Sequence, residues 1–306
     1  MKPFIIFALL FFSFAVNPVL ANETLFRDTL NQFINKALAE NPELHEAGRQ
    51  IEVLKQIPPQ VSAFDDPVLQ FDLLNLPTDT FAFNQEPMTQ KRVTLSQKLP
   101  FPGKLSLRSN MAERDVDISQ FTYDDLQLAI TRQVKQSYFE LCYVLAAIEI
   151  SNQNKSLLEQ FITITETKYS VGKGIQQDVI KAQVELSKLL NDLIDLNKRK
   201  ETEEARLNTL MNLPPDAPLS IAHGIKKTIF DYEMKDLFKI AEERRPVFKK
   251  LRSLQEKYRA SRNLAEKEYY PDFRVGLSYG QRENNPLQDR ADFASAFVSI
   301  NIPIWY

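Results

Sequence analysis

The sequence predicts a mainly α-helical chain with some β-structure, built from a long antiparallel helical hairpin and four short strands. Three observations lead to this fold class. A very long region lacks proline and glycine, four segments alternate apolar with polar residues, and the chain contains an internal repeat. Only seven of the 306 residues are glycine, which suits long helices better than a loop-rich sheet protein.

The helical hairpin is predicted from the central third of the chain. A segment rich in helix formers runs from about 111 to 169, Gly172 and Gly174 interrupt it, and a second run covers about 176–211. Apolar residues in the second run recur in alternating steps of three and four, which predicts coiled-coil packing: Ile175, Val179, Ala182, Leu186, Leu189, Leu193 and Leu196. At 1.5 Å per residue the second helix is about 50 Å long and the first reaches about 85 Å, so together they form a rod.

Each of the four predicted strands alternates apolar and polar residues. The apolar positions are Leu69, Phe71 and Leu73; Val93, Leu95 and Leu99; Phe273, Val275, Leu277 and Tyr279; and Val298, Ile300 and Ile302. A period of two places one apolar and one polar face on each strand, as a sandwich or a membrane barrel requires. The alternation alone does not choose between those two. Long polar loops over 77–90 and 281–292 join the strands of each pair.

An internal repeat relates the two ends of the chain. Three proline landmarks recur in one order about 204 positions apart: Pro42 with Pro246, Pro67 with Pro271, and Pro100 with Pro303. We therefore expect a first repeat over 22–220 and a partial second repeat over 221–306. The first repeat is expected to contain a short helix, strands about 68–76 and 92–100, and the hairpin about 104–212. The second is expected to contain a helix and strands about 272–280 and 294–304.

The N-terminus has the features of an export signal. Lys2 precedes an apolar run over 4–14, and Val19-Leu20-Ala21 places small residues at the positions that signal peptidase accepts. We expect residues 1–21 to be this signal. Beyond it, no run reaches the roughly 18 apolar residues of a spanning helix.

Composition argues against several classes of protein. With 38 basic and 40 acidic side chains the chain is nearly neutral, so no nucleic-acid partner is expected. The single Cys142 excludes an internal disulfide, and His45 and His223 lack neighbours at ligand spacing, so no metal or cofactor is expected. No nucleophile elbow, zinc-binding histidine pair or phosphate-binding loop is present. No catalytic residues are therefore assigned, and the chain is not expected to be an enzyme.

The turn between the long helices resembles a known family. Residues 168–179 read Lys-Tyr-Ser-Val-Gly-Lys-Gly-Ile-Gln-Gln-Asp-Val, which is similar to the helix tip of TolC-type outer-membrane efflux proteins. The order of signal, short helix, strand pair and long hairpin matches that family as well. The segment Gln97-Lys98-Leu99-Pro100-Phe101-Pro102-Gly103-Lys104 resembles the strand-to-helix junction of the branch that exports heavy metals.

The resemblance implies an outer-membrane channel subunit of a tripartite efflux system. Its four transmembrane strands would contribute to a trimeric β-barrel in outer-membrane lipid, with the helices extending into the periplasm. The implied partners are two further copies, a periplasmic adaptor protein and an inner-membrane pump. The likeness of residues 97–104 makes heavy-metal cations a candidate cargo, although this segment also occurs in family members without an assigned substrate, so the cargo stays open. Carried over by residue, Val171, Gly172 and Lys173 would dock the adaptor, and Asp178 would help to close the tunnel tip. A carboxylate in the first turn of a helix is also favoured by the helix dipole alone.

The sequence departs from the family pattern at its C-terminus. In the family the second repeat continues into another long hairpin, whereas here the chain stops at Tyr306. We therefore expect a C-terminally truncated subunit without the second helical hairpin. Two alternatives stay open: an exported periplasmic coiled-coil adaptor or interaction protein, and a non-functional fragment of an efflux channel.

Overall fold

The computed structural model describes residues 18–221 and 230–304, so the expected export signal over 1–21 lies almost entirely outside the described residues. The chain forms two compact units, one from 1–46 and 126–234 and the other from 47–125 and 235–306. This division differs from the division into repeats, because the 67-residue helix α4 (Lys104–Ser170) contributes to both units. The predicted fold class, mainly helical with a small antiparallel sheet, is confirmed.

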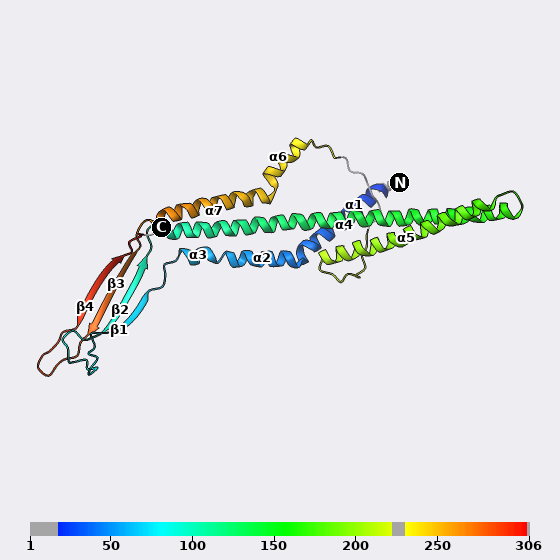
Figure 1. Ribbon diagram of the computed structural model, residues 1–306. Helices are drawn as coiled ribbons and strands as arrows, with labels where there is room; N and C mark the ends of the chain where they lie inside the picture. The colour runs from blue at the N-terminus through cyan, green and yellow to red at the C-terminus, as the bar shows by residue number, and fades with distance from the viewer. Residues whose placement is uncertain (1–17, 222–229, 305–306) are drawn as a thin grey trace, which may run out of the picture. The chain divides into compact units, whose positions relative to one another are not determined.

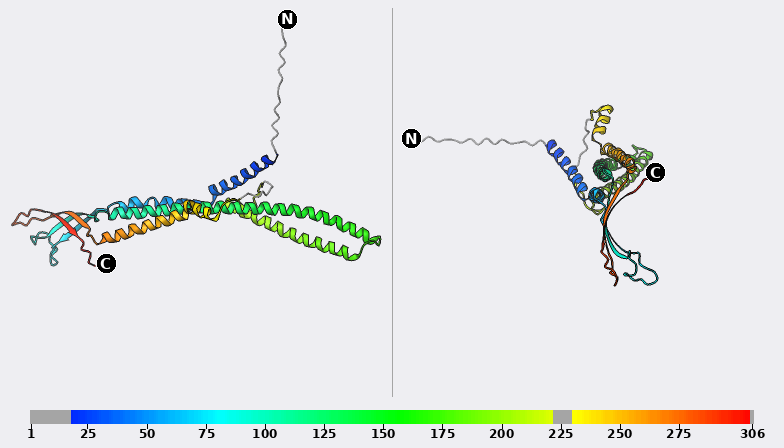
Figure 2. Two further views of the ribbon diagram at one scale, coloured as in Figure 1. Left: turned by 90° about the horizontal axis from the view of Figure 1, so that it is seen from above. Right: turned by 90° about the vertical axis from the view of Figure 1, so that its left-hand side faces the viewer.

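The first unit contains α1 (Pro18–Glu40), the start of α2 (Pro42–Leu54), most of α4 and α5 (Gln176–Leu210). Figures 1 and 2 show α5 running back along the last part of α4. The core of this unit centres on Tyr138, which is fully buried and meets the ring of Phe33 edge-on at 5.8 Å. Its other large buried side chains come from α4, α5 and the turn after α5: Ile130, Val134, Leu141, Val144, Leu207 and Met211.

Asn41 fixes the junction between α1 and α2. Its side-chain Oδ1 accepts hydrogen bonds from the backbone N–H groups of Glu43 (3.0 Å) and Leu44 (3.3 Å), as an N-cap residue does. Its Nδ2 donates to the carbonyl of Leu210 at 3.2 Å, at the end of α5. Pro42 starts α2, where its missing N–H costs nothing. The Asn-Pro pair therefore starts one helix and anchors the end of another.

The substitution N41A is expected to destabilise the first unit by about 2–3 kcal/mol. It removes the cap, worth about 1 kcal/mol, and leaves the partly buried Leu210 carbonyl without its donor. Denaturant unfolding followed by circular dichroism measures this loss. N41D, which keeps the cap and loses only the bond to Leu210, should lie between the parent and N41A. An N41A chain as stable as the parent would contradict this role.

The second unit holds the sheet. Its strands are β1 (Val68–Leu74), β2 (Gln90–Leu99), β3 (Phe273–Gln281) and β4 (Phe293–Ile300), antiparallel in the order β1-β2-β3-β4. The central pairing joins strands from the two expected repeats, with Leu99 opposite Phe273. β4 ends at Ile300, short of the expected 304. The next residue, Asn301, instead accepts from the N–H of Asp272 through its side chain and donates its own N–H to the Asp272 carbonyl.

Three shorter helices complete the second unit: α3 (Ile57–Ser62), α6 (Met234–Arg244) and α7 (Pro246–Glu268). α7 lies along the first part of α4 (Figures 1 and 2), with Ser253 and Ala260 buried one heptad apart. Lys257 binds Asp115 at 2.7 Å across this contact. Within the described part of the chain, no helix is both long and apolar enough to cross a membrane.

Candidate functional site: the helix tip and the strand-to-helix junction

The turn between α4 and α5 is a Schellman-type helix ending. The N–H of Lys173 donates to the carbonyl of Lys168 at 2.8 Å, and the N–H of Gly172 donates to that of Tyr169 at 3.0 Å. These two bonds satisfy carbonyls that the last turn of α4 would otherwise leave unpaired. The motif requires a left-handed residue, and Gly172 supplies it with φ of +73°.

The two glycines of the turn have different roles. A Cβ on Gly172 would meet nothing within 4 Å, so only its backbone angle demands glycine. A Cβ on Gly174 would lie 3.2 Å from the Cβ of Lys168, so this position needs glycine for close approach of the chain. Gly174 was not among the predicted site residues, although its proximity to Gly172 in the sequence is a visible signal.

The substitution G172A is expected to destabilise the turn by about 1–2 kcal/mol, because alanine resists the left-handed conformation. Exchange of the turn amide hydrogens should then accelerate roughly five- to thirtyfold. G172N is the matched control, since asparagine tolerates this conformation and should show a smaller effect. Equal exchange in G172A and the parent would show that the turn does not depend on the left-handed angle.

The residues predicted to dock a partner are exposed at this turn. Val171 is 61% exposed and Ile175 is 59% exposed, so two apolar side chains face solvent beside an exposed Lys173. The structure therefore brings Val171, Gly172 and Lys173 together at the end of the hairpin.

Asp178 lies a short distance from these residues, in the first turn of α5. Its backbone N–H donates to the Ile175 carbonyl at 3.2 Å, while its side chain is exposed. In the portion of the chain that the structure describes, the Asp178 carboxylate has no hydrogen-bond or ion-pair partner. The helix dipole favours its charge there, and the carboxylate is available to a group outside this chain.

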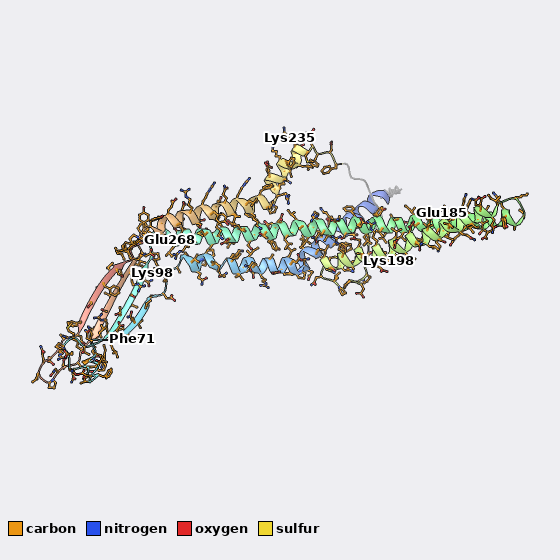
Figure 3. All side chains as sticks on the ribbon, in the orientation of Figure 1. Phe71, Lys98, Glu185, Lys198, Lys235 and Glu268 are labelled. Carbon is orange, nitrogen blue, oxygen red and sulfur yellow. The ribbon has the colours of Figure 1, made fainter. Side chains whose placement is uncertain are left out.

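A second polar cluster lies where β2 leads into α4. Lys104 is 4% exposed, and its Nζ donates to Asp272 Oδ1 at 2.7 Å and to the carbonyl of Tyr270 at 2.9 Å. The same Asp272 oxygen accepts from the N–H of Phe101 at 2.9 Å, and Lys98 lies 3.9 Å from its other oxygen. Figure 3 labels Lys98 at this end of the sheet.

This cluster gives a structural explanation for the Pro-Phe-Pro-Gly-Lys segment. Gly103 turns the chain with φ of +93°, and a Cβ there would lie 2.9 Å from the side chain of Lys267. The ring of Phe101 stacks on Tyr270 with centroids 4.7 Å apart. The segment therefore ties the β2–α4 junction to the junction between α7 and β3. The sequence prediction missed this pairing, because nothing local links Lys104 to a residue 168 positions away.

The cluster lowers the pKa of the Asp272 carboxyl. Burial alone would raise the pKa of the Asp272 carboxyl, but the hydrogen bonds from Lys104 and the Phe101 N–H outweigh it, so the pKa falls below its ordinary value. The cluster is thus an ion pair at neutral pH. Within the described residues no group of three or more His, Cys, Asp or Glu side chains could hold a metal ion.

Comparisons with known proteins agree with this architecture. The family described as outer membrane efflux protein matches residues 33–213. The outer-membrane channel OprN superposes with a TM-score of 0.71 at 17% identity, over 90% of this chain and 64% of that one. CusC superposes with 0.72 at 14% identity (91% and 66%), and VceC from Vibrio cholerae with 0.73 at 15% (92% and 70%).

At such low identity these superpositions show a shared fold. The chain spans about two thirds of the length of these three structures. No match was found among the curated proteins.

Proposed function

Because the chain belongs to the outer membrane efflux protein family, whose members are channels and not enzymes, we propose that it is a channel subunit of a tripartite efflux system. In this proposal it conducts substrates passively across the outer membrane, from an inner-membrane pump and a periplasmic adaptor. The observation that carries the proposal is the exposed apolar face of the four-stranded sheet.

The two faces of the sheet differ in polarity. Rows of residues that pair across the four strands show this difference. One row across all four strands is Leu69, Leu95, Leu277 and Ala296, and the adjacent row is Gln70, Thr94, Ser278 and Ser295. The first row lies on a face whose side chains are largely exposed, with Phe71 at 72% and Val298 at 71%. An apolar face on one side and a polar face on the other suit a sheet between lipid and a water-filled lumen.

The edges of the sheet suggest how copies would assemble. β1 and β4 have no strand on their outer sides within the described residues. Open edges are costly in lipid, where unpaired backbone groups find no water. We propose a homotrimer in which β4 of one copy pairs with β1 of the next, closing a barrel of about twelve strands. The helices would then extend into the periplasm.

The internal repeat supports dividing the chain at about residue 220. The landmarks Pro42 and Pro246 both start helices, α2 and α7, and each of these helices leads toward a strand pair. We propose 22–220 and 221–306 as duplicated units, with 1–21 as the export signal.

At the helix tip we propose that Val171, Gly172 and Lys173 contact the adaptor and that Asp178 helps to keep the assembled tip closed. D178A is then expected to leave the stability of the chain within about 0.5 kcal/mol, because the carboxylate is exposed. Conductance of the reconstituted channel should nevertheless rise. D192A, an exposed acid farther along α5, is the control. Equal conductance in D178A and D192A would contradict the gating role.

The proposed channel function does not include heavy-metal cations as its cargo. Only the likeness of residues 97–104 to one branch of the family points to such cargo, and the Lys104–Asp272 pair accounts for that segment structurally.

Cell fractionation tests the proposal. The chain should remain in the outer membrane after washing with salt, and it should migrate differently on a gel before and after heating. If salt removes the chain from membranes, the periplasmic coiled-coil alternative is correct and the channel proposal is wrong. If the chain stays in the membrane without conducting, it is a non-functional fragment of a channel.

A further inference from the structure

The polar face of the sheet carries two positive charges side by side, at the end of β2 and the start of β3. Lys98 and Arg274 lie directly opposite each other in the antiparallel pairing, on the face that also carries Ser96 and Ser278. Like charges at such positions repel each other, because the Cβ atoms of opposite residues lie only about 5 Å apart. A negative group that binds between the two side chains would relieve this repulsion.

The acids around this pair neutralise only part of its charge. The Nζ of Lys98 lies 3.7 Å from Asp65 and 3.9 Å from Asp272, and Asp272 is already bound by Lys104. Three cationic side chains, including Arg274, thus share two carboxylates. Arg274 is exposed and has no ion-pair or hydrogen-bond partner among the described residues. Its guanidinium group can therefore bind an anion through two parallel hydrogen bonds.

An aromatic ring lies next to these charges on the same face. Phe297 lies opposite Gly276, and a Cβ on Gly276 would be 2.5 Å from two ring atoms of Phe297, so the ring lies over that glycine. Arg274 comes two residues before Gly276 in β3, at a diagonal position from Phe297 that long side chains reach. Phe297 is 38% exposed. Part of its ring is therefore accessible beside the Arg274 guanidinium group.

The other phenylalanine of this face has different surroundings. The guanidinium carbon of Arg282 lies 4.1 Å from the ring centroid of Phe293, whereas no described cation or ring makes such a contact with Phe297. Arg92, in the same row as Phe293, lies directly opposite Asp72, so a carboxylate accompanies its charge. Within the described strands, the combination of an uncovered ring and an unbalanced cation thus belongs to the end of the sheet near Phe297.

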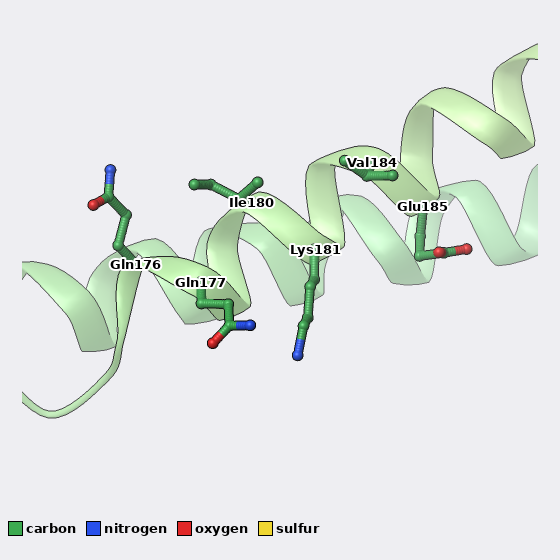
Figure 4. Close-up of a pocket in the computed structure, with 6 residues that line it drawn as sticks. All are labelled: Gln176, Gln177, Ile180, Lys181, Val184 and Glu185. Atoms are coloured by element: carbon green, nitrogen blue, oxygen red, sulfur yellow. The ribbon is translucent and has the colours of Figure 1, made fainter.

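The groove on α5 beside the helix tip also lacks this combination. Figure 4 shows the six residues that line it: Gln176, Gln177, Ile180, Lys181, Val184 and Glu185. Lys181 and Glu185 have opposite charges and lie one helical turn apart, and none of the six side chains is aromatic. An anion would meet no excess of positive charge in that groove.

We propose that Lys98, Arg274 and Phe297 form a binding site for an organic anion that carries an aromatic group. Arg274 and Lys98 bind its acidic group, and its ring packs on the ring of Phe297. The proposed channel directs this face of the sheet towards its lumen, so the inference rests on that function and adds a class of cargo to it. All three residues belong to one copy, so binding can be measured separately from conduction.

A fluorine NMR titration of the full-length chain in a non-ionic detergent tests this site. The probe is para-(trifluoromethyl)benzenesulfonate, and its signal in empty micelles gives the background. Trifluoromethanesulfonate keeps the charge without the ring, and para-(trifluoromethyl)benzyltrimethylammonium keeps the ring with the opposite charge. The chain should bind the first probe about fivefold more tightly than either of the others.

Three variants locate the bound probe. R274Q removes the unpaired charge and should weaken binding about five- to tenfold, and F297L, which keeps an apolar side chain, should weaken it about two- to fivefold. R92Q is the matched control, because Arg92 lies on the same face about 20 Å from Lys98 along β2. It should leave the affinity unchanged. Circular dichroism of each variant checks that the fold is kept.

Equal affinities for the three probes, or no binding beyond that of empty micelles, would overturn the site. Equal losses in R274Q and R92Q would overturn it as well. Conductance in planar bilayers separates this inference from the proposed function. A chain that conducts but binds no probe contradicts the site and leaves the channel proposal intact. A chain that binds the probe but does not conduct contradicts the channel proposal and leaves the site.

Discussion

Replacing Asp272 by asparagine is expected to destabilise the second unit by about 3–5 kcal/mol, the usual cost of leaving one partner of a buried ion pair behind. The side chain of Lys104 is 4% exposed, and its ammonium group would lose the only carboxylate that lies within 4 Å of it among the described residues. The amide could still accept from the Phe101 N–H, so the loss comes mainly from the unpaired charge. Unfolding by denaturant in detergent, followed by circular dichroism, measures it.

Two variants sharpen this prediction. Asp65 lies 3.7 Å from Lys98 but is 62% exposed at its side chain, so D65N should cost less than about 1 kcal/mol. The double substitution K104M/D272N removes both charges and should recover part of the loss of D272N. Equal effects of D65N and D272N would show that burial of the pair contributes nothing.

The same pair predicts how stability depends on pH. The pKa of Asp272 is lower in the folded chain than the ordinary value of about 4, so its contribution is fully present above that value. It is lost as the pH falls through the lower, folded-state pKa. The difference in unfolding free energy between the parent and D272N should therefore be constant above about pH 5 and shrink below about pH 4. A difference that does not change down to pH 2 would contradict the assignment.

Features that depend on residues close together in the sequence could be predicted, and features that depend on distant residues could not. The hairpin was predictable because its seam and its glycines are local signals, and the alternation of β1, β2 and β3 is local as well. The strand order was not predictable, since the pairing of Leu99 with Phe273 joins residues that lie far apart in the chain. The ion pair of Lys104 with Asp272 depends on that pairing.

In β4, the alternation of apolar and polar residues is harder to recognise in the sequence than in the other strands. Its register puts Phe293 opposite Gly280 and Phe297 opposite Gly276, on the mainly polar face of the sheet. A Cβ on Gly276 would lie 2.5 Å from the ring of Phe297, so the glycine makes room for the aromatic side chain. Two apolar residues on the polar face obscure the period of two in the sequence. Only the cross-strand register explains why they are tolerated.

A substitution on the apolar face of the sheet is also expected to have a large effect. Leu277 lies in the central row of this face, between Leu95 and Ala296 and 66% exposed. If this face contacts lipid, L277R places a charge near the middle of the hydrocarbon and should cost about 2–4 kcal/mol per subunit. The fraction of chain that stays in the outer membrane after washing should fall accordingly. Quantitative gels of washed membranes measure it.

The neighbouring residue is the matched control. Ser278 lies one position along β3, on the face that also carries Thr94 and the native arginines Arg92 and Arg274. S278R should therefore leave membrane retention close to that of the parent, because this face already accommodates guanidinium groups. L277A separates size from charge and should lower retention much less than L277R. If both arginine variants lost retention equally, the two faces of the sheet would not differ in their surroundings. A sheet buried on both faces would then explain the data better than one between lipid and lumen.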